Sequence, residues 1–102
     1  MAIKKEYSND KTICRITFTL PVEVAEQFDE VALVGDFNNW DHKANIFVLK
    51  DNGERSVWLD LEANKEYQFR YLGNDDVWLN ESEADKAVPT PYGDSQNSVI
   101  IV

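Results

Sequence analysis

The chain has 102 residues, of which 43% are hydrophobic and 28% are charged, and its formal net charge at pH 7 is −9. This length predicts a single domain over residues 1–102, with one hydrophobic core and no separate catalytic lobe. The acidity argues against nucleic acids and anionic membranes as partners, because both are bound by basic surfaces.

Cysteine usage and the N-terminal residues bear on where the protein works. Cys14 is the only cysteine, so an internal disulfide is impossible and packing has to hold the fold, which fits a reducing compartment. The N-terminal residues lack the apolar segment of a secretory signal, and no apolar run reaches the length of a membrane span. We therefore expect a cytoplasmic protein.

Residues 11–20, KTICRITFTL, begin a series of segments in which apolar and polar residues alternate. Four apolar side chains share one face of this segment: Cys14, Ile16, Phe18 and Leu20. The period of two predicts a half-buried strand ending at Pro21, since proline cannot donate to a strand ladder. The acidic residues 22–30 form either one helical turn or a loop. The apolar run 30–35, EVALVG, predicts a strand that is either covered on both faces or central in its sheet.

A hairpin is predicted in the middle of the chain. Asn52 and Gly53, which both tolerate a positive φ, separate residues 46–50 from residues 55–61. Residues 67–72, YQFRYL, alternate again, and Tyr67, Phe69 and Tyr71 share the apolar face.

The C-terminal third predicts two further strands, at residues 77–80 and 97–102. Between them, residues 81–95 contain two prolines and one glycine and are predicted to form an ordered loop. Six or seven short strands with frequent turns and no long helix predict an all-β fold, an antiparallel β-sandwich.

Residue types suited to catalysis or metal binding are scarce. His42 is the only histidine and stands in a polar turn without a nucleophilic serine motif, so a catalytic triad is not expected. A zinc site needs several histidine or cysteine ligands, and Cys14 lies on the apolar face of a strand, where it is expected to be an inert core thiol. We expect no metal, no cofactor and no catalytic residue.

Carboxylates are plentiful, with nineteen in the chain, so pairs of acids arise by chance. A glycosidase needs two acids that flank a cleft and have different pKa values. The acids at residues 75–76 and 81–83 fall in predicted loops, where solvent is expected to keep them ordinary, and EF-hand spacing is absent. Glycosidase activity is therefore the weakest interpretation.

Two tryptophans, Trp40 and Trp78, stand in turns between predicted strands. Each either covers an edge of the sandwich or offers an indole face on which a sugar ring can stack, with polar side chains around the ring's hydroxyls. Polar candidates occur in the sequence near these positions: Asn38, Asn39, Gln68, Ser95 and Asn97. Composition alone does not decide whether they converge.

Three stretches, in order, resemble a known family. They are EVALVGDFNNWD from residue 30, WLDLEANKEYQFRYL from residue 58 and VWLNESEADKAVPTPYGDSQNSVIIV from residue 77. Together they are similar to the glycogen-binding module of the beta subunit of AMP-activated protein kinase. They also resemble the early-set domains at the N-terminus of isoamylases and glycogen-branching enzymes, and most of all the free-standing bacterial versions.

The resemblance implies an immunoglobulin-like early-set sandwich that binds α-1,4-linked glucans such as glycogen, starch or maltooligosaccharides. It implies a site built from Trp40, Trp78, a basic residue and a polar loop that includes Ser95 and Asn97. Within the turn, it implies that Phe37 anchors the chain, that Asn38 and Asn39 accept the tight backbone, and that Trp40 stands at the rim.

Two positions depart from the family pattern. The family's lysine is Gln68 here, which can bond a hydroxyl but carries no charge. The family's leucine falls at Gly93, beside Tyr92. Either Tyr92 supplies the missing apolar contact, or a helical glucan is bound more weakly.

The leading hypothesis is therefore a non-catalytic α-glucan-binding module. The alternative is a docking domain that associates with a glycoside hydrolase or branching enzyme and binds sugar weakly or not at all. In that alternative, an exposed sheet bearing Trp58 and Leu72 is the expected interface.

Overall fold

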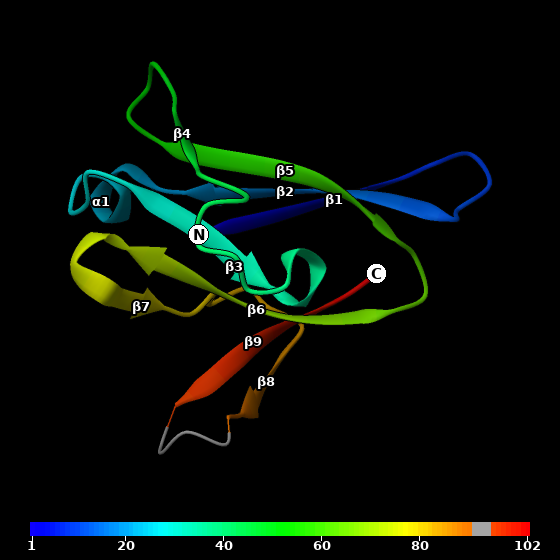
Figure 1. The fold of residues 1–102 in the computed structure, drawn as a ribbon. Coiled ribbons are helices and arrows are strands. Elements are labelled where there is room, and N and C mark those ends of the chain that lie inside the picture. The colour runs from blue at the N-terminus through cyan, green and yellow to red at the C-terminus, as the bar shows by residue number, and fades with distance from the viewer. Residues whose placement is uncertain (91–94) are drawn as a thin grey trace.

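The computed structural model describes residues 1–90 and 95–102, which fold into two antiparallel β-sheets packed face to face (Figure 1). Sheet A contains, in spatial order, β1 (Ala2–Tyr7), β2 (Ile13–Leu20), β5 (Arg55–Glu62) and β4 (Val48–Leu49). Sheet B contains β3 (Val31–Gly35), β6 (Glu66–Gly73), β9 (Gln96–Ile101) and β8 (Lys86–Pro89), with β7 (Val77–Leu79) also paired to β6. The fold is an all-β, immunoglobulin-like antiparallel sandwich, as the sequence predicts.

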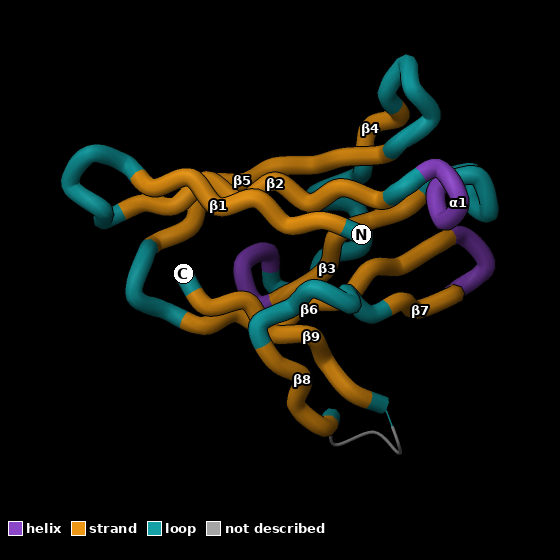
Figure 2. Tube along the Cα trace, turned by 180° about the vertical axis from the view of Figure 1, so that it is seen from behind, coloured by secondary structure: helices purple, strands orange, loops and turns teal. Residues whose placement is uncertain are grey.

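Viewed from behind, the two sheets form separate layers, with β1, β2 and β5 above β3, β6 and β9 (Figure 2). The apolar face of β2 is fully buried between them, as predicted: Cys14, Ile16, Phe18 and Leu20. Across the core, Phe18 meets Phe69 of β6 edge-to-face at 5.3 Å between ring centroids. Strand β3 is buried along its whole length although it stands at an end of sheet B's order. The alternative of cover on both faces is therefore confirmed, and a central position in the sheet is not.

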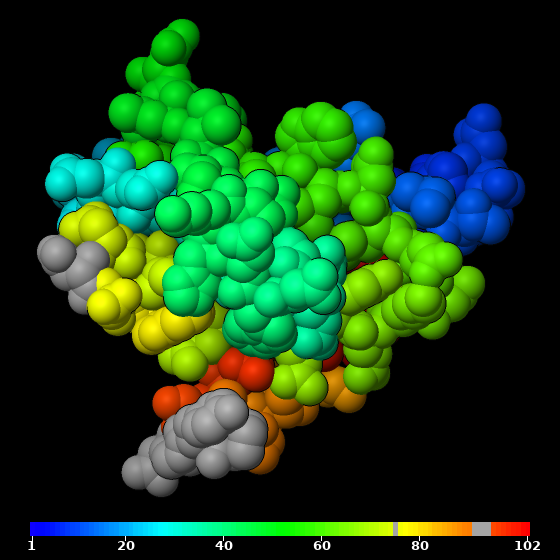
Figure 3. Space-filling view, viewed as in Figure 1, coloured from blue at the N-terminus to red at the C-terminus, as the bar shows by residue number. Residues whose placement is uncertain are grey.

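The segment between β2 and β3 forms one helical turn, α1 (Val22–Ala25), which decides between the two predicted alternatives. The predicted hairpin joins β4 to β5 and projects from the molecule (Figure 3). Gly53 takes the positive φ, +89°, while Asn52 does not. The Gly53 N–H donates to the Lys50 carbonyl at 3.0 Å, so the hairpin turns through one left-handed residue rather than two.

Strand β1 was not predicted from the sequence. It pairs with β2 over its full length and forms an edge of sheet A. Its side chain Lys5 reaches across to the other sheet, where its Nζ donates to Asp85 Oδ2 and to the Ile101 carbonyl, both at 2.9 Å. Charged residues on an edge strand also discourage pairing with other chains.

Residues 81–95 were predicted to be loop throughout, and this is wrong for β8. This strand pairs with β9 at the edge of sheet B. An edge strand tolerates Pro89, because one side of the strand needs no ladder hydrogen bonds.

Glu81 also differs from the expectation of a solvated acid, because it is only 5% exposed. Its Oε1 accepts the Tyr71 hydroxyl at 2.7 Å, and its N–H donates to Ser98 Oγ at 2.9 Å. Burial, together with the charge of Glu81, raises the pKa of Tyr71. These bonds fasten the segment after β7 to the centre of sheet B.

The short helices of the described chain are α1, η1 (Asp36–Asn38) and η2 (Asn74–Asp76). Among the described residues no helix has both the length and the apolar character needed to cross a membrane.

Candidate ligand-binding site

The stretch Gly35 to Trp40 carries the chain from β3 into the turn η1. A Cβ on Gly35 would lie 2.6 Å from the Gln68 carbonyl oxygen and 2.8 Å from the Cβ of Phe69. Real Cβ atoms do not approach backbone this closely, so the glycine is needed where β3 passes β6. The turn can therefore fold back over sheet B instead of leaving it.

Phe37 holds the turn from below. It is partly buried against the main core, and its ring lies 6.4 Å from Phe18 and from Phe69 and 6.1 Å from Tyr67, between centroids. The structure thus agrees with the expectation that Phe37 anchors the turn.

Asn38 closes the turn through its side chain. Its Oδ1 accepts the Gly35 N–H at 3.1 Å, and its Nδ2 donates to the Leu33 carbonyl and to Asn45 Oδ1, both at 2.9 Å. The amide is thus used inside the protein and does not point at a ligand. Asn39 follows with φ of 56°, a left-handed conformation that asparagine tolerates well.

Trp40 is half-buried and has φ of 56°, which is unusual for a bulky residue and persists only where its surroundings impose it. The backbone N–H donates to the Gly35 carbonyl at 2.9 Å. The indole Nε1 donates to Asp36 Oδ1 at 3.0 Å, while Asp36 Oδ2 accepts the Gln68 N–H at 2.9 Å. One carboxylate therefore ties the indole to β6. The ring packs on an apolar patch of sheet B: Ala32, Val34 and Leu72.

Trp78 comes from β7 and is 37% exposed. Its ring lies 5.1 Å from the Arg70 guanidinium carbon, and the His42 ring meets it edge-to-face at 5.6 Å. The ring is thus held between a strand and the loop after η1.

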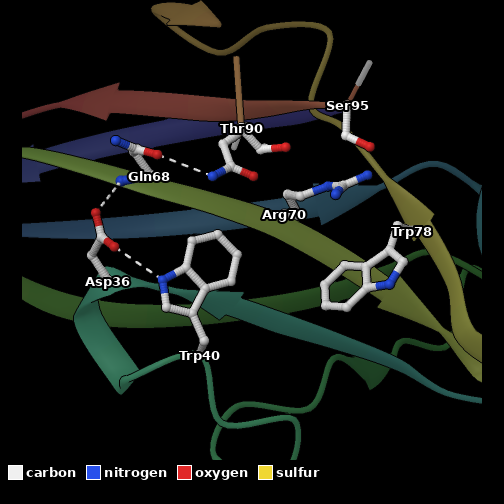
Figure 4. Close-up of a pocket in the computed structure, with 8 residues that line it drawn as sticks. Asp36, Trp40, Gln68, Arg70, Trp78, Thr90 and Ser95 are labelled. Atoms are coloured by element: carbon white, nitrogen blue, oxygen red, sulfur yellow. Dashed lines mark hydrogen bonds between the residues drawn. The ribbon is translucent and has the colours of Figure 1, made fainter. Parts of the chain in front are cut away.

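A pocket of about 480 Å³ opens on the outer face of sheet B and contains both indoles. Figure 4 shows these side chains facing one another across β6, with the Arg70 guanidinium between Trp78 and Ser95. The lining residues are Asp36, Trp40, Gln68, Arg70, Trp78, Thr90, Ser95 and Asn97.

The structure brings together Trp40, Trp78, Gln68, Ser95 and Asn97, which are five of the six side chains predicted from the sequence. Tyr92, the sixth, lies outside the described residues, as does Gly93.

The amides of Gln68 and Asn97 face each other across β6 and β9. Asn97 Nδ2 donates to Gln68 Oε1 at 3.0 Å. This bond orients both side chains and leaves the Gln68 Nε2 donor and the Asn97 Oδ1 acceptor for a ligand.

Sequence reasoning missed Arg70, Asp36 and Thr90. Arg70 could have been found, because it follows Gln68 by two residues and so must share its face of β6. Its Nε is buried and has no hydrogen-bond partner among the described residues. Arg70 also brings into the pocket the positive charge that the resemblance expects and Gln68 lacks.

The docking face expected from Trp58 and Leu72 is wrong. Leu72 is 9% exposed and lies under Trp40 on sheet B, whereas Trp58 belongs to β5 of sheet A. The two residues therefore share no surface.

Among the described residues, the pocket holds no acid pair. Among its lining residues Asp36 is the single carboxylate, and both of its oxygens accept hydrogen bonds from the protein. Within residues 1–90 and 95–102, no three His, Cys, Asp or Glu side chains are placed to hold a metal ion. Cys14 is fully buried, as expected of a core thiol.

Neither the models of known protein families nor the curated proteins contain a match to this chain. Its class is thus defined by its own structure: an immunoglobulin-like sandwich that carries an aromatic pocket on the outer face of one sheet.

Proposed function

We propose that this protein binds α-1,4-linked glucans, such as glycogen, starch or maltooligosaccharides, without cleaving them. One observation carries the proposal: a single pocket combines Trp40 and Trp78 with the polar side chains Gln68, Arg70 and Asn97.

The chemistry of the pocket matches that of a glucose chain. The faces of a glucose ring carry C–H groups that stack on indoles, while its edges carry hydroxyls that need hydrogen-bond partners. Trp40 and Trp78 supply stacking surfaces, and the amides of Gln68 and Asn97 and the guanidinium of Arg70 supply donors and an acceptor. Because the ligand is neutral, binding should depend little on salt concentration.

The resemblance to the glycogen-binding modules supports the same ligand. It assigns sugar contacts to Trp40, Trp78, Ser95 and Asn97, and these side chains line one pocket. In this proposal Arg70 takes the part of the family's basic residue. We also propose a cytoplasmic location, with which the free, buried thiol of Cys14 is compatible.

The carboxylates of the described pocket support a non-catalytic role. Glycoside hydrolysis uses an acid and a second carboxylate on either side of the bond. Among the described lining residues Asp36 has no such partner, and its oxygens are engaged by Trp40 and Gln68.

The test is a calorimetric titration with maltoheptaose and, as a matched control, the β-linked cellohexaose. We expect the α-glucan alone to bind, with a dissociation constant of about micromolar to millimolar, since two stacking surfaces leave little free energy after ordering costs. Trp40→Ala should abolish binding and lower stability by less than the roughly 3–5 kcal/mol of a fully buried tryptophan.

Val48→Ala serves as the control for removal of an apolar side chain, because Val48 is exposed on the other sheet, and should leave the affinity for maltoheptaose unchanged. No heat with maltoheptaose in the wild type would contradict the proposal. Co-purification with a glucan-metabolising enzyme, combined with native-gel migration unchanged by glycogen, would instead support the docking alternative.

A further inference from the structure

Trp58 is more exposed than the tryptophans of the pocket. Its side chain is 55% exposed, against 37% for Trp78, and Trp40 is half-buried. It stands on the outer face of sheet A, opposite the pocket's sheet, and no role proposed above uses it. A tryptophan this exposed on the outer face of a sheet is an unusual use of a large apolar side chain.

The ring of Trp58 is held in place rather than loose. The Arg15 guanidinium carbon lies 4.0 Å from the ring centroid. Arg15 is itself held by Asp60, whose two oxygens accept its Nε at 2.9 Å and its Nη2 at 3.2 Å. Since the guanidinium covers one face of the indole, the exposed area comes from the other face and the ring edges. The bidentate bond also lowers the pKa of Asp60, so the pair stays charged at neutral pH.

Side-chain hydroxyls lie near the ring on β2 and β5. Thr17 lies directly across from Trp58 in the β2–β5 pairing, and the next pair along the same face is Thr19 and Ser56. On the other side of the Arg15–Asp60 pair a shallow depression of about 300 Å³ adjoins the ends of β1 and β2. An open aromatic face between hydroxyls and a hydrogen-bonding pair suits a pyranose ring.

Charge on this face also points to a neutral ligand. The protein carries a net charge of −9, yet charges near Trp58 are matched: Arg15 with Asp60, and Lys4 with Glu6 at 3.6 Å. A protein partner would call for a broad apolar centre with few charges. Val48 of β4, which pairs with Ser56, adds one exposed apolar side chain to this face. The side chains beside the indole on β2 and β5 are threonines, a serine and an ion pair, so a sugar ring fits the face better.

From these observations we propose that Trp58 is the platform of a second glucan-binding surface, on the opposite sheet from the pocket. It rests on the proposed function for its choice of ligand. Because the Trp58 surface is less enclosed than the pocket, it binds oligosaccharide more weakly. With one site on each outer face, a single molecule can contact two glucan chains or two branches of one polymer, which raises its avidity for polysaccharide without a tighter site.

The first test follows the two indole N–H resonances that remain in the Trp40→Ala variant, those of Trp58 and Trp78, while maltoheptaose is added. The expected result is a saturable shift of the Trp58 resonance with the pocket disabled, and no shift with cellohexaose. A Trp58 resonance that stays still, while the wild-type pocket binds maltoheptaose, overturns the second surface and leaves the proposed function intact. Failure of the pocket to bind in the wild type would instead show in the Trp78 resonance and would count against the proposed function.

The second test measures the turbidity of glycogen mixed with the protein. Wild-type protein should cross-link glycogen, and Trp58→Ala should lose the cross-linking while keeping the pocket's affinity for maltoheptaose. Circular dichroism verifies the fold of that variant. Turbidity unchanged by Trp58→Ala overturns the proposal, as does self-association in sedimentation that Trp58→Ala abolishes, because the face would then be a protein interface.

Discussion

The outer faces of the two sheets differ although their inner faces are alike. Both inner faces contribute apolar rows to one core, whereas outside, sheet A has a depression of about 300 Å³ at the ends of β1 and β2, and sheet B has the pocket of about 480 Å³ with its two indoles. The hollow arises because the turn after β3 folds back and lays Trp40 across sheet B. The difference shows that the connections between strands, more than the strands, make the ligand site.

Gly35→Ala is expected to have the largest effect on the turn that forms the pocket, because that turn depends on β3 passing close to β6. The added methyl would meet backbone and Cβ atoms at under 3 Å, and overpacking of this kind costs about 1–3 kcal/mol or more. We expect a loss of at least about 2 kcal/mol in the free energy of unfolding, measured by urea denaturation. Thr17→Ala on sheet A is the control and should change stability little. Equal stability of the Gly35→Ala variant and the wild type would contradict the account of the turn.

Arg70→Ala tests whether the pocket needs its guanidinium, whose counterpart on sheet A, Arg15, is held by Asp60. We expect maltoheptaose affinity to fall about tenfold, as for loss of one charged hydrogen bond at about 1.4 kcal/mol. Arg70→Lys should recover only part of it, because an ammonium cannot reproduce the planar fork. Calorimetry measures both variants, and full affinity in Arg70→Ala would remove Arg70 from the site.

Asp36→Ala removes the carboxylate that joins Trp40 to β6. The indole N–H and the Gln68 N–H would each lose an acceptor, at an expected cost of about 1 kcal/mol in stability. The maltoheptaose affinity should fall several-fold because Trp40 is no longer oriented. Asp36→Asn keeps one acceptor, so its stability and its maltoheptaose affinity should lie between those of the wild type and of Asp36→Ala. A variant with normal affinity but a shifted Trp40 indole resonance would show that orientation of this ring is unimportant.

The smallest effect concerns the contact that fastens β1 of sheet A to sheet B. Burial raises the pKa of Asp85, but hydrogen bonds from the Ile101 N–H and from Lys5 outweigh it, so the folded pKa is lowered. Asp85 therefore adds stability above its unfolded pKa of about 4 and loses it as pH falls through the folded value.

We expect Asp85→Asn to be less stable than the wild type at pH 7 by less than about 1 kcal/mol, because the pair is partly exposed to solvent. Thermal unfolding measured from pH 7 to pH 2.5 should show the two proteins converging below about pH 4. A stability gap that stays constant over this range would mean that the charge of Asp85 is not involved.

Sequence periodicity predicted the parts of this molecule that local pattern controls. Strands β2, β3, β5 and β6 have clear apolar faces, and the sandwich follows from them. Strand β1 was not predicted because lysines interrupt its apolar pattern at a sheet edge. Strand β8 was not predicted because it is short and ends in proline.

The candidate site was predictable where aromatic residues mark it and less so elsewhere. Arg70 was visible in principle, from its spacing to Gln68. The part played by Asp36 was not, because it depends on the turn folding back onto β6. The burial of Glu81 likewise depends on strand pairing, which brings Tyr71 and Ser98 around it.

The central claim, that the pocket on sheet B binds α-glucan through its two tryptophans, is tested most directly by the indole N–H resonances of the wild-type protein. The account predicts that maltoheptaose shifts Trp40 and Trp78 together, with one common dissociation constant, before any change at Trp58, and that cellohexaose shifts neither. Stationary Trp40 and Trp78 resonances at saturating maltoheptaose would contradict it.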